Sequence, residues 1–385
     1  MLGMAQGKGK GRLEVVDAVR ALALFGVLVM NLRDMSGLNF LAPEAFDAVQ
    51  GPIGHIVDFM LLVLLDEKFL SAFSFLFGLS FYLLLERKSD QPGFRAMYFR
   101  RLTALGVFGL INVGFLYWAD ILLIYAIFGA TLVFFVRLPQ RLLLTTAALF
   151  LFGAPALLAM LGAAENSSGQ LPSDVRALSI FGGAPYWEQV QYGLVRYFGT
   201  SESSLVEIWD HTNVFGMLLL GLWAGRAQIP HQIEENRRFL RLLAASCIPL
   251  GLTAGLVRIG LPEPSVVATA ARAGAPILAV GYMSLAALLL SHPGAAGVRL
   301  WLSAPGKLAL TNYLAYGLIG QALFYSWGLG WLGTVGSAGI LLLSIAVYTL
   351  LALASQLWLK PFRMGPTEWL WRCLTYLRLE PLRRH

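Results

Sequence analysis

Ten apolar stretches, several of them close to the length that crosses a bilayer, take up most of this 385-residue chain. They cover residues 21–31, 69–85, 102–118, 121–136, 142–161, 214–225, 242–257, 275–290, 308–327 and 340–359. A helix needs about 20 apolar residues to span a hydrocarbon core, and the shorter stretches extend into Gly, Ser and Trp flanks. Only 13% of the residues are charged, whereas a soluble chain would alternate apolar and polar faces. We therefore predict an all-α, polytopic transmembrane bundle of about ten helices, in one domain over residues 1–385.

The basic residues are distributed unequally between the gaps that separate these stretches. Of the 29 lysines and arginines, 23 fall on one side of the predicted bundle and six on the other. By the positive-inside rule the richer side is cytoplasmic, and it holds both termini. The surplus behind the net charge of +7 therefore indicates topology, and we expect no nucleic-acid partner.

Several segments outside the apolar stretches have a recognisable character. The Gly/Lys-rich residues 1–15 are expected to be a disordered cytoplasmic start, and 164–207 an outer segment. Apolar residues recur at helical spacing within Pro185–Phe198, which predicts an amphipathic helix on the outer surface. Residues 361–385 are expected to form a cytoplasmic interfacial helix that begins near a proline. The charged cluster Asp66-Glu67-Lys68 is expected to interrupt the helical path, so that a new helix begins near Lys68.

Polar side chains inside a bilayer are costly and so point to function. Counted along their helices, Asn31 and Asn112 lie at similar depths in the outer half, near Asp120 and Asp210. We expect these four to line one cavity that opens outward. His211, next to Asp210, and His55, on the outer surface, are the candidate bases. The alternatives are that the asparagines only join helices, that Asp120 caps the following helix, and that the histidines are solvated.

A second, basic feature is expected near the inner surface, around Arg20, Arg100, Arg101 and Lys307. Asp17 lies three residues before Arg20, and the two could form no more than an ion pair at the start of a helix. Spacings of small residues at Gly221/Gly225 and Gly251/Gly255 favour close helix packing within the chain over a dimer interface, although a homo-oligomer stays open. The sequence contains no zinc-ligand spacing, phosphate loop or nucleophile elbow, so we expect no metal. Cys247 and Cys373 are not expected to form a disulfide.

Six segments together resemble the YeiB family of bacterial inner-membrane proteins. They are Val16–Asn31, Lys68–Gly78, Arg100-Arg101-Leu, Tyr117–Gly129, Leu308–Leu314 and Gly365–Arg372. The resemblance implies a multi-pass protein of the bacterial inner membrane. That family in turn is similar to a superfamily of membrane acyltransferases that includes the lysosomal heparan acetyltransferase. Those relatives are thought to take an acyl group from cytoplasmic acyl-CoA and deliver it to an acceptor on the far side.

The resemblance implies roles for individual residues. Asn31 matches a pocket asparagine, Asp17 and Arg20 match the opening motif, and Arg100 and Arg101 would meet the CoA phosphates. We assign Lys307 and Asn312 to the same inner site. Two positions depart from the family pattern: Ala21 replaces a glycine, and Asn112 replaces a histidine. Because an asparagine cannot act as a general base near neutral pH, this second departure affects the expected chemistry.

Two functions follow as hypotheses. In the first, the protein moves an acyl group from acyl-CoA to a periplasmic or lipid-linked acceptor. The base is then His211, His55 or a carboxylate such as Asp210, and Asn31 or Asn112 donates to the oxyanion. In the second, the protein is a non-catalytic transporter or lipid-binding protein that uses the same pocket. Under both hypotheses we expect membrane lipids to surround the bundle.

Overall fold

The computed structural model describes residues 2–153, 156–157, 175–199, 205–261 and 266–384. Within these ranges the chain is helical, and its β-structure is one isolated bridge between Phe362 and Arg383. The longer helices are α1 (Leu2–Met35), α2 (Pro43–Leu64), α3 (Lys68–Lys88), α4 (Phe94–Phe115), α5 (Leu122–Phe135), α6 (Gln140–Ala148), α8 (Val175–Gly183), α9 (Tyr186–Phe198), α10 (Leu205–Arg226), α11 (Arg237–Gly260), α13 (Gly274–Ser291), α14 (Ala296–Lys307), α15 (Ala309–Phe324), α16 (Ser337–Trp358) and α17 (Pro366–Tyr376). The six-residue α12 (Val266–Ala271) and short 3₁₀ and π turns join them. The predicted all-α class is confirmed for the described residues.

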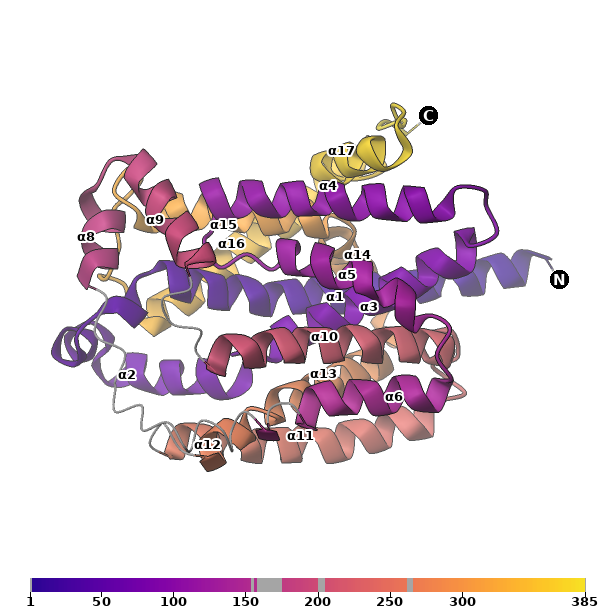
Figure 1. Cartoon of the computed structure of the whole chain (residues 1–385), viewed down its shortest axis with the longest axis horizontal. Helices are drawn as coiled ribbons and strands as arrows, with labels where there is room; N and C mark the ends of the chain where they lie inside the picture. Colours follow the sequence, from indigo (N-terminus) through magenta and orange to yellow (C-terminus); the bar gives the residue numbers. More distant parts are fainter. Residues whose placement is uncertain (1, 154–155, 158–174, 200–204, 262–265, 385) are drawn as a thin grey trace.

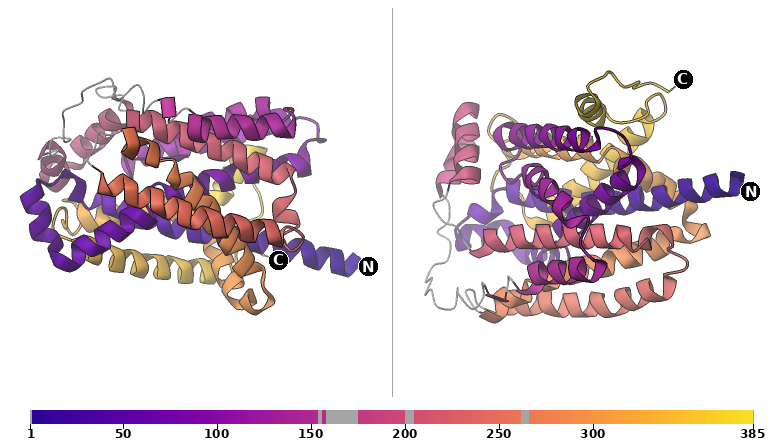
Figure 2. Two further views of the ribbon diagram at one scale, coloured as in Figure 1. Left: turned by 90° about the horizontal axis from the view of Figure 1, so that it is seen from below. Right: turned by 45° about the vertical axis from the view of Figure 1, so that its right-hand side comes forward.

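The long helices run roughly along the long axis of the molecule, with α8 and α9 at the end opposite the N-terminus (Figure 1). Both chain termini lie toward one end of the bundle in each further view (Figure 2). By length and composition, five segments of the described chain could cross a membrane, fewer than the ten predicted. They are Glu14–Met35, Pro43–Lys88, Arg237–Gly260, Gly274–Ser291 and Ser337–Trp358. Helices α5 and α15 are apolar but have only 14 and 16 residues, less than the ~20 of a full span.

Most of the predicted boundaries between helices agree with the structure. The α3 helix begins at Lys68, directly after Glu67, whose φ of 63° breaks the helical path. Helices α4 and α5 are separated only by the turn between Phe115 and Leu122, and α9 and α17 lie within the predicted surface helices. The N-terminus differs, because α1 is helical from Leu2 and so includes most of the segment predicted to be disordered. This segment contains no proline that would end the helix. Parts of the expected outer segment 164–207 lie outside the described residues.

Helix α1 is at the centre of the bundle and contacts α3, α13, α14, α15 and α16. Its residues Leu24, Leu28 and Leu32 are fully buried. The glycines of the small-residue spacings pack against other helices of the same chain, as the sequence analysis favoured. A Cβ on Gly221 would overlap the backbone of α3, and a Cβ on Gly251 would lie 2.6 Å from Leu278 of α13. Such close approaches hold the backbones of these helices at fixed distances.

Candidate functional site

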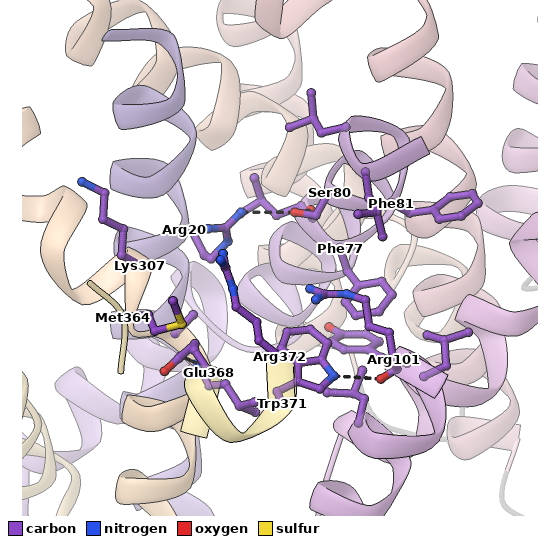
Figure 3. A pocket seen from close by; sticks show the side chains of 18 of the residues that line it. Arg20, Phe77, Ser80, Phe81, Arg101, Lys307, Met364, Glu368, Trp371 and Arg372 are labelled. Carbon is purple, nitrogen blue, oxygen red and sulfur yellow. Dashed lines mark hydrogen bonds between the residues drawn. The ribbon is translucent and has the colours of Figure 1, made fainter. Parts of the chain in front are cut away.

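A cavity of about 730 Å³ lies between α1, α3, α4, α5, α14, α15 and α17. Its volume is in the range of pockets that hold small molecules or cofactors. One wall is apolar and aromatic and the other carries many charges, a combination that suits an amphiphilic ligand with an anionic head (Figure 3). The charged side chains come from α1, α3, α4, α14 and α17 and from the segments on either side of α17.

The charged wall is strongly basic. Eight cations line it, against three carboxylates. The cations are Arg20, Arg87, Lys88, Arg101, Lys307, Arg363, Arg372 and Arg378. Two of the carboxylates are paired with cations of the same wall. Asp17 Oδ1 lies 2.6 Å from the guanidinium nitrogen Nη1 of Arg20, and Glu380 Oε1 lies 2.6 Å from Arg378 Nε. Most of the positive charge is therefore not neutralised within the described protein.

The third carboxylate, Glu368, holds α17 against the start of α15. Its oxygens accept hydrogen bonds from the backbone amides of Leu310 and Thr311, at 2.7 and 3.1 Å, and from Thr311 Oγ1. A carboxylate is stabilised at this place because unpaired amides and the helix dipole meet at a helix N-terminus. Burial nevertheless raises the pKa of Glu368 above its ordinary value. Glu368 therefore positions α17 against the start of α15.

Helix α17 is also joined to α4. The indole nitrogen of Trp371 donates to the carbonyl oxygen of Arg101 at 2.8 Å, and the Arg101 guanidinium lies 3.5 Å above the centre of the Trp371 ring. This cation–π contact fixes the direction of the Arg101 side chain. In Figure 3 the head groups of Arg20, Arg101 and Arg372 all point into the same space. Like charges repel, so this arrangement favours a bound anion.

The structure brings together only part of the predicted inner site. Arg20, Arg101, Lys307 and Asp17 line the large cavity. The Arg100 side chain instead donates to the Thr375 carbonyl oxygen at 3.0 Å and lines a second cavity of about 360 Å³.

Asn312 also lies away from the large cavity. Its amide donates to Pro305 O and Ser355 Oγ, each at 3.2 Å, and so joins α15 to α14 and α16. The sequence analysis missed the cavity residues Arg372 and Trp371. The Gly-Pro-Thr-Glu-Trp-Leu-Trp-Arg motif that contains them was the available signal.

The aromatic wall leads away from the basic one toward α5 and α15. Phe77 and Tyr125 stack with ring centres 5.1 Å apart, and Phe73 also stacks with Tyr125, with ring centres 6.1 Å apart. The Tyr125 hydroxyl is 2.9 Å from Ser74 Oγ, so its polar atom is satisfied. Tyr313, at the start of α15, completes this wall. An apolar chain would find a continuous surface here.

Tyr313 connects the cavity to a buried polar cluster in the turn between α4 and α5. Its hydroxyl donates to Asp120 Oδ1 at 3.3 Å, and the Asn112 amide donates to the same oxygen at 2.7 Å. Asp120 Oδ2 accepts from the Leu123 backbone amide at 2.8 Å, so Asp120 also caps α5, as the alternative expected. All three side chains of the cluster are at most 3% exposed. Burial raises the pKa of Asp120 to about 7.

The other predicted residues of the outer site lie elsewhere. Asp210 lies beside the charged group Asp66, Glu67, Arg258 and Arg272, at the break before α3. Asn31 is half-buried on α1 and lines neither the large cavity nor the smaller one. The four polar residues expected in one cavity are therefore brought together only as the pair Asn112 and Asp120.

Neither candidate histidine lines the large cavity. His211 is exposed, and its ring stands edge-on to Phe128 with centres 6.1 Å apart. Adjacent residues on a helix point about 100° apart, so the side chains of His211 and Asp210 leave α10 in different directions. His55 is exposed on α2, with Nε2 3.3 Å from Asp47 Oδ1.

Comparison with known proteins gives relatives over the whole chain. Residues 224–378, from α10 to α17, match the model of a family described as a protein of unknown function, DUF418. The chain is 29% identical to the uncharacterized protein YxaH of Bacillus subtilis, covering 96% of each. It is 30% identical to the uncharacterized protein YeiB of Escherichia coli, over 94% of this chain and 95% of that protein. A 39.9 kDa protein of Bacillus acidopullulyticus is 26% identical, with 96% of each covered. No solved structure matches the chain.

Proposed function

We propose that this chain, which belongs to the YeiB family of bacterial proteins, binds an acyl-CoA in the large cavity and transfers its acyl group to an acceptor from the other side of the membrane. The observation that carries the proposal is the joining of a basic wall and an aromatic wall in one cavity. CoA carries several phosphate charges, which suit Arg20, Arg101 and Arg372, whereas an acyl chain suits the aromatic wall.

The donor and the acceptor would approach from opposite ends. The basic wall includes Arg87 and Lys88 from the last turn of α3 and Arg372 from α17. Helix α17 lies toward the end of the bundle that also holds the chain termini (Figure 1). The buried cluster around Asp120 lies in the turn at the other end of α4, where α9 contributes Tyr197 to the Asp120 carbonyl oxygen at 3.4 Å. An acyl group that extends along the aromatic wall to Tyr313 would thus reach the end from which an outer acceptor arrives.

We place the basic end in the cytoplasm and the chain in the bacterial inner membrane as a multi-pass protein of about ten spans. The support is the split of 23 basic residues against six. Short apolar helices such as α5 would cross only part of the bilayer by themselves and complete their span through flanking turns.

Cysteine labelling of intact cells tests this orientation. In a variant with Cys247 and Cys373 replaced by alanine, we expect a membrane-impermeant maleimide to modify Gln191→Cys on α9 and not Ser89→Cys after α3. Both positions are exposed, so accessibility within the protein does not limit either reaction. Labelling of Ser89→Cys after the cells are broken is the control. Labelling of Ser89→Cys alone in intact cells would reverse the orientation.

A binding experiment tests the donor site. We expect purified protein in detergent to bind octanoyl-CoA and CoA, and Arg372→Gln to weaken binding by about 10- to 100-fold, since a hydrogen bond to a charged group contributes ~1.5–3 kcal/mol. Arg95→Gln is the matched control, because Arg95 is exposed on α4 and lines neither cavity. Isothermal titration calorimetry measures both. Equal affinity in the wild type and Arg372→Gln, or no binding of either CoA compound, would contradict the proposal.

A second function, binding or transport of an anionic lipid without chemistry, uses the same cavity. One observation favours it: in the described chain no histidine lines the cavity, so the usual general base is missing there. The same titration separates the two functions. Binding of a phospholipid such as phosphatidylglycerol, with no binding of octanoyl-CoA, would favour the lipid-binding protein.

A further inference from the structure

Tyr313 belongs to two environments at once. It lines the large cavity, and its hydroxyl makes hydrogen bonds to the polar cluster between α4 and α5. There the hydroxyl donates to Asp120 Oδ1 at 3.3 Å and accepts from the Ile121 backbone amide at 3.3 Å. The Tyr313 side chain is thus a polar connection between the space that would hold an acyl group and a carboxylate that is only 2% exposed.

Asp120 is surrounded by groups that suit a proton acceptor. Three donors reach its carboxylate: the Asn112 amide, the Tyr313 hydroxyl and the Leu123 backbone amide. The ionisable side chains that face it are tyrosines, namely Tyr313 on α15, Tyr197 on α9 and Tyr125 on α5. Burial opposes the charged form and raises the pKa of Asp120 to about 7, the range in which a base both holds and releases protons readily.

Asn112 has a hydrogen-bonding capacity that the protein does not use. Its Oδ1 is buried and has no hydrogen-bond partner among the described residues. An amide can present either its NH₂ group or its oxygen to a neighbour. Rotation of the amide by a half turn would therefore let Asn112 accept a hydrogen bond from a protonated Asp120. The unpaired oxygen, otherwise costly in a buried place, is explained if Asp120 alternates between two protonation states.

We propose that Tyr313 is the catalytic residue of the transfer, and that it passes the proton of a hydroxyl-bearing acceptor to Asp120, with Asn112 holding Asp120 in both protonation states. The inference rests on the proposed acyl transfer and assigns its base. It replaces the histidines of the sequence analysis with a tyrosine that the cavity places within reach of the ligand.

In this reaction the thioester of acyl-CoA is broken and an ester of the acceptor is formed. The acceptor oxygen gives its proton to Tyr313 Oη while the Tyr313 proton moves to Asp120 Oδ1. The acceptor oxygen forms a bond to the acyl carbon, and the bond between that carbon and the sulfur of CoA breaks. The proton then returns from Asp120 through Tyr313 to the departing sulfur. The products are an ester of the acceptor and free CoA thiol.

Release of thiol from octanoyl-CoA, in the presence of lipids extracted from the bacterial envelope, tests the inference. Loss of the Tyr313 hydroxyl in Tyr313→Phe should lower kcat by about 10²-fold, as expected for loss of acid–base catalysis, with KM for octanoyl-CoA unchanged. Tyr316→Phe is the matched control. Tyr316 lies one turn further along the same helix and is as deeply buried, but does not line the cavity. Its variant should keep the wild-type kcat.

The pH dependence gives a second measurement that a structural role would not change. Because Asp120 must be ionised to take a proton, the wild-type kcat should rise with pH through about 7. Asp120→Asn should lose both the rate and this rise, and it should still bind octanoyl-CoA by calorimetry.

A Tyr313→Phe variant that releases thiol at the wild-type rate would overturn the inference and leave the proposed function standing. Failure of the wild type to bind octanoyl-CoA would remove the proposed function itself. Binding without any release of thiol would overturn the assignment of Tyr313.

Discussion

Replacing Gly78 by alanine is expected to destabilise the bundle by ~3 kcal/mol or more. Gly78 of α3 lies directly against α10. A Cβ at this position would overlap the Leu218 carbonyl oxygen and lie 2.8 and 2.9 Å from the Leu218 carbonyl carbon and Cα. These are backbone atoms, which cannot turn away as the end of a flexible side chain can. The two helices would have to separate.

Separation of α3 from α10 would disturb the packing of both helices. Gly221 of α10 makes the reciprocal approach, since a Cβ there would overlap the Phe75 carbonyl oxygen of α3. The same helix α3 supplies Phe73, Phe77 and Ser80 to the large cavity. We therefore expect Gly78→Ala to lower both the temperature of unfolding in detergent and the affinity for octanoyl-CoA.

Gly297→Ala provides the control for this prediction. Gly297 is exposed within α14, and a Cβ there would meet nothing within 4 Å. Alanine favours a helix over glycine by up to about 1 kcal/mol, so this variant should be unchanged or slightly more stable. Thermal unfolding followed by tryptophan fluorescence measures both variants. If Gly78→Ala and Gly297→Ala unfold at the same temperature, the close contact between α3 and α10 is wrong.

The second large effect concerns the stability of the protein against pH. The pKa of Asp120 is about 7 in the folded protein, where burial disfavours its charge, and ~3.9 in an unfolded chain. The folded state therefore binds the proton more tightly than the unfolded state. The stability that protonated Asp120 contributes is fully present below about pH 4, and it is lost as the pH rises through about 7. The difference between a pKa of about 7 and one of ~3.9 corresponds to a change in the free energy of unfolding on the order of 4 kcal/mol.

Asp120→Asn should remove this dependence, since an amide does not ionise in this range. The variant has one acceptor oxygen where Asp120 has two, so either the Leu123 amide or the Asn112 and Tyr313 donors lose their acceptor, and the variant should be less stable than the wild type at low pH. The difference between the unfolding temperatures of wild type and variant should then shrink as the pH rises from 5 to 8. Other carboxylates contribute equally to both proteins and cancel in this difference. A constant difference over that range would show that Asp120 stays ionised in the folded protein.

The sequence by itself determined the features that depend on neighbours along the chain. The apolar stretches predicted helices, and the charged cluster predicted the break before Lys68. The pairing of Asp17 with Arg20 and the capping of α5 by Asp120 are also local, because three residues along a helix or at its start suffice for the contact. These interactions need no knowledge of which helices pack together.

Only the tertiary structure decided which distant residues share a site. It brings Trp371 against Arg101 and Tyr313 against Asp120, contacts that join residues 270 and 193 positions apart. It also separates Asp210 and His211 from Asn112, although their depths along the predicted helices are similar. Hydrophobic periodicity indicates which face of a helix is buried, but not which helix that face meets. The neighbour is set by backbone shape at residues such as Gly78 and by single polar anchors such as Glu368, and their partners cannot be identified until the helices are packed.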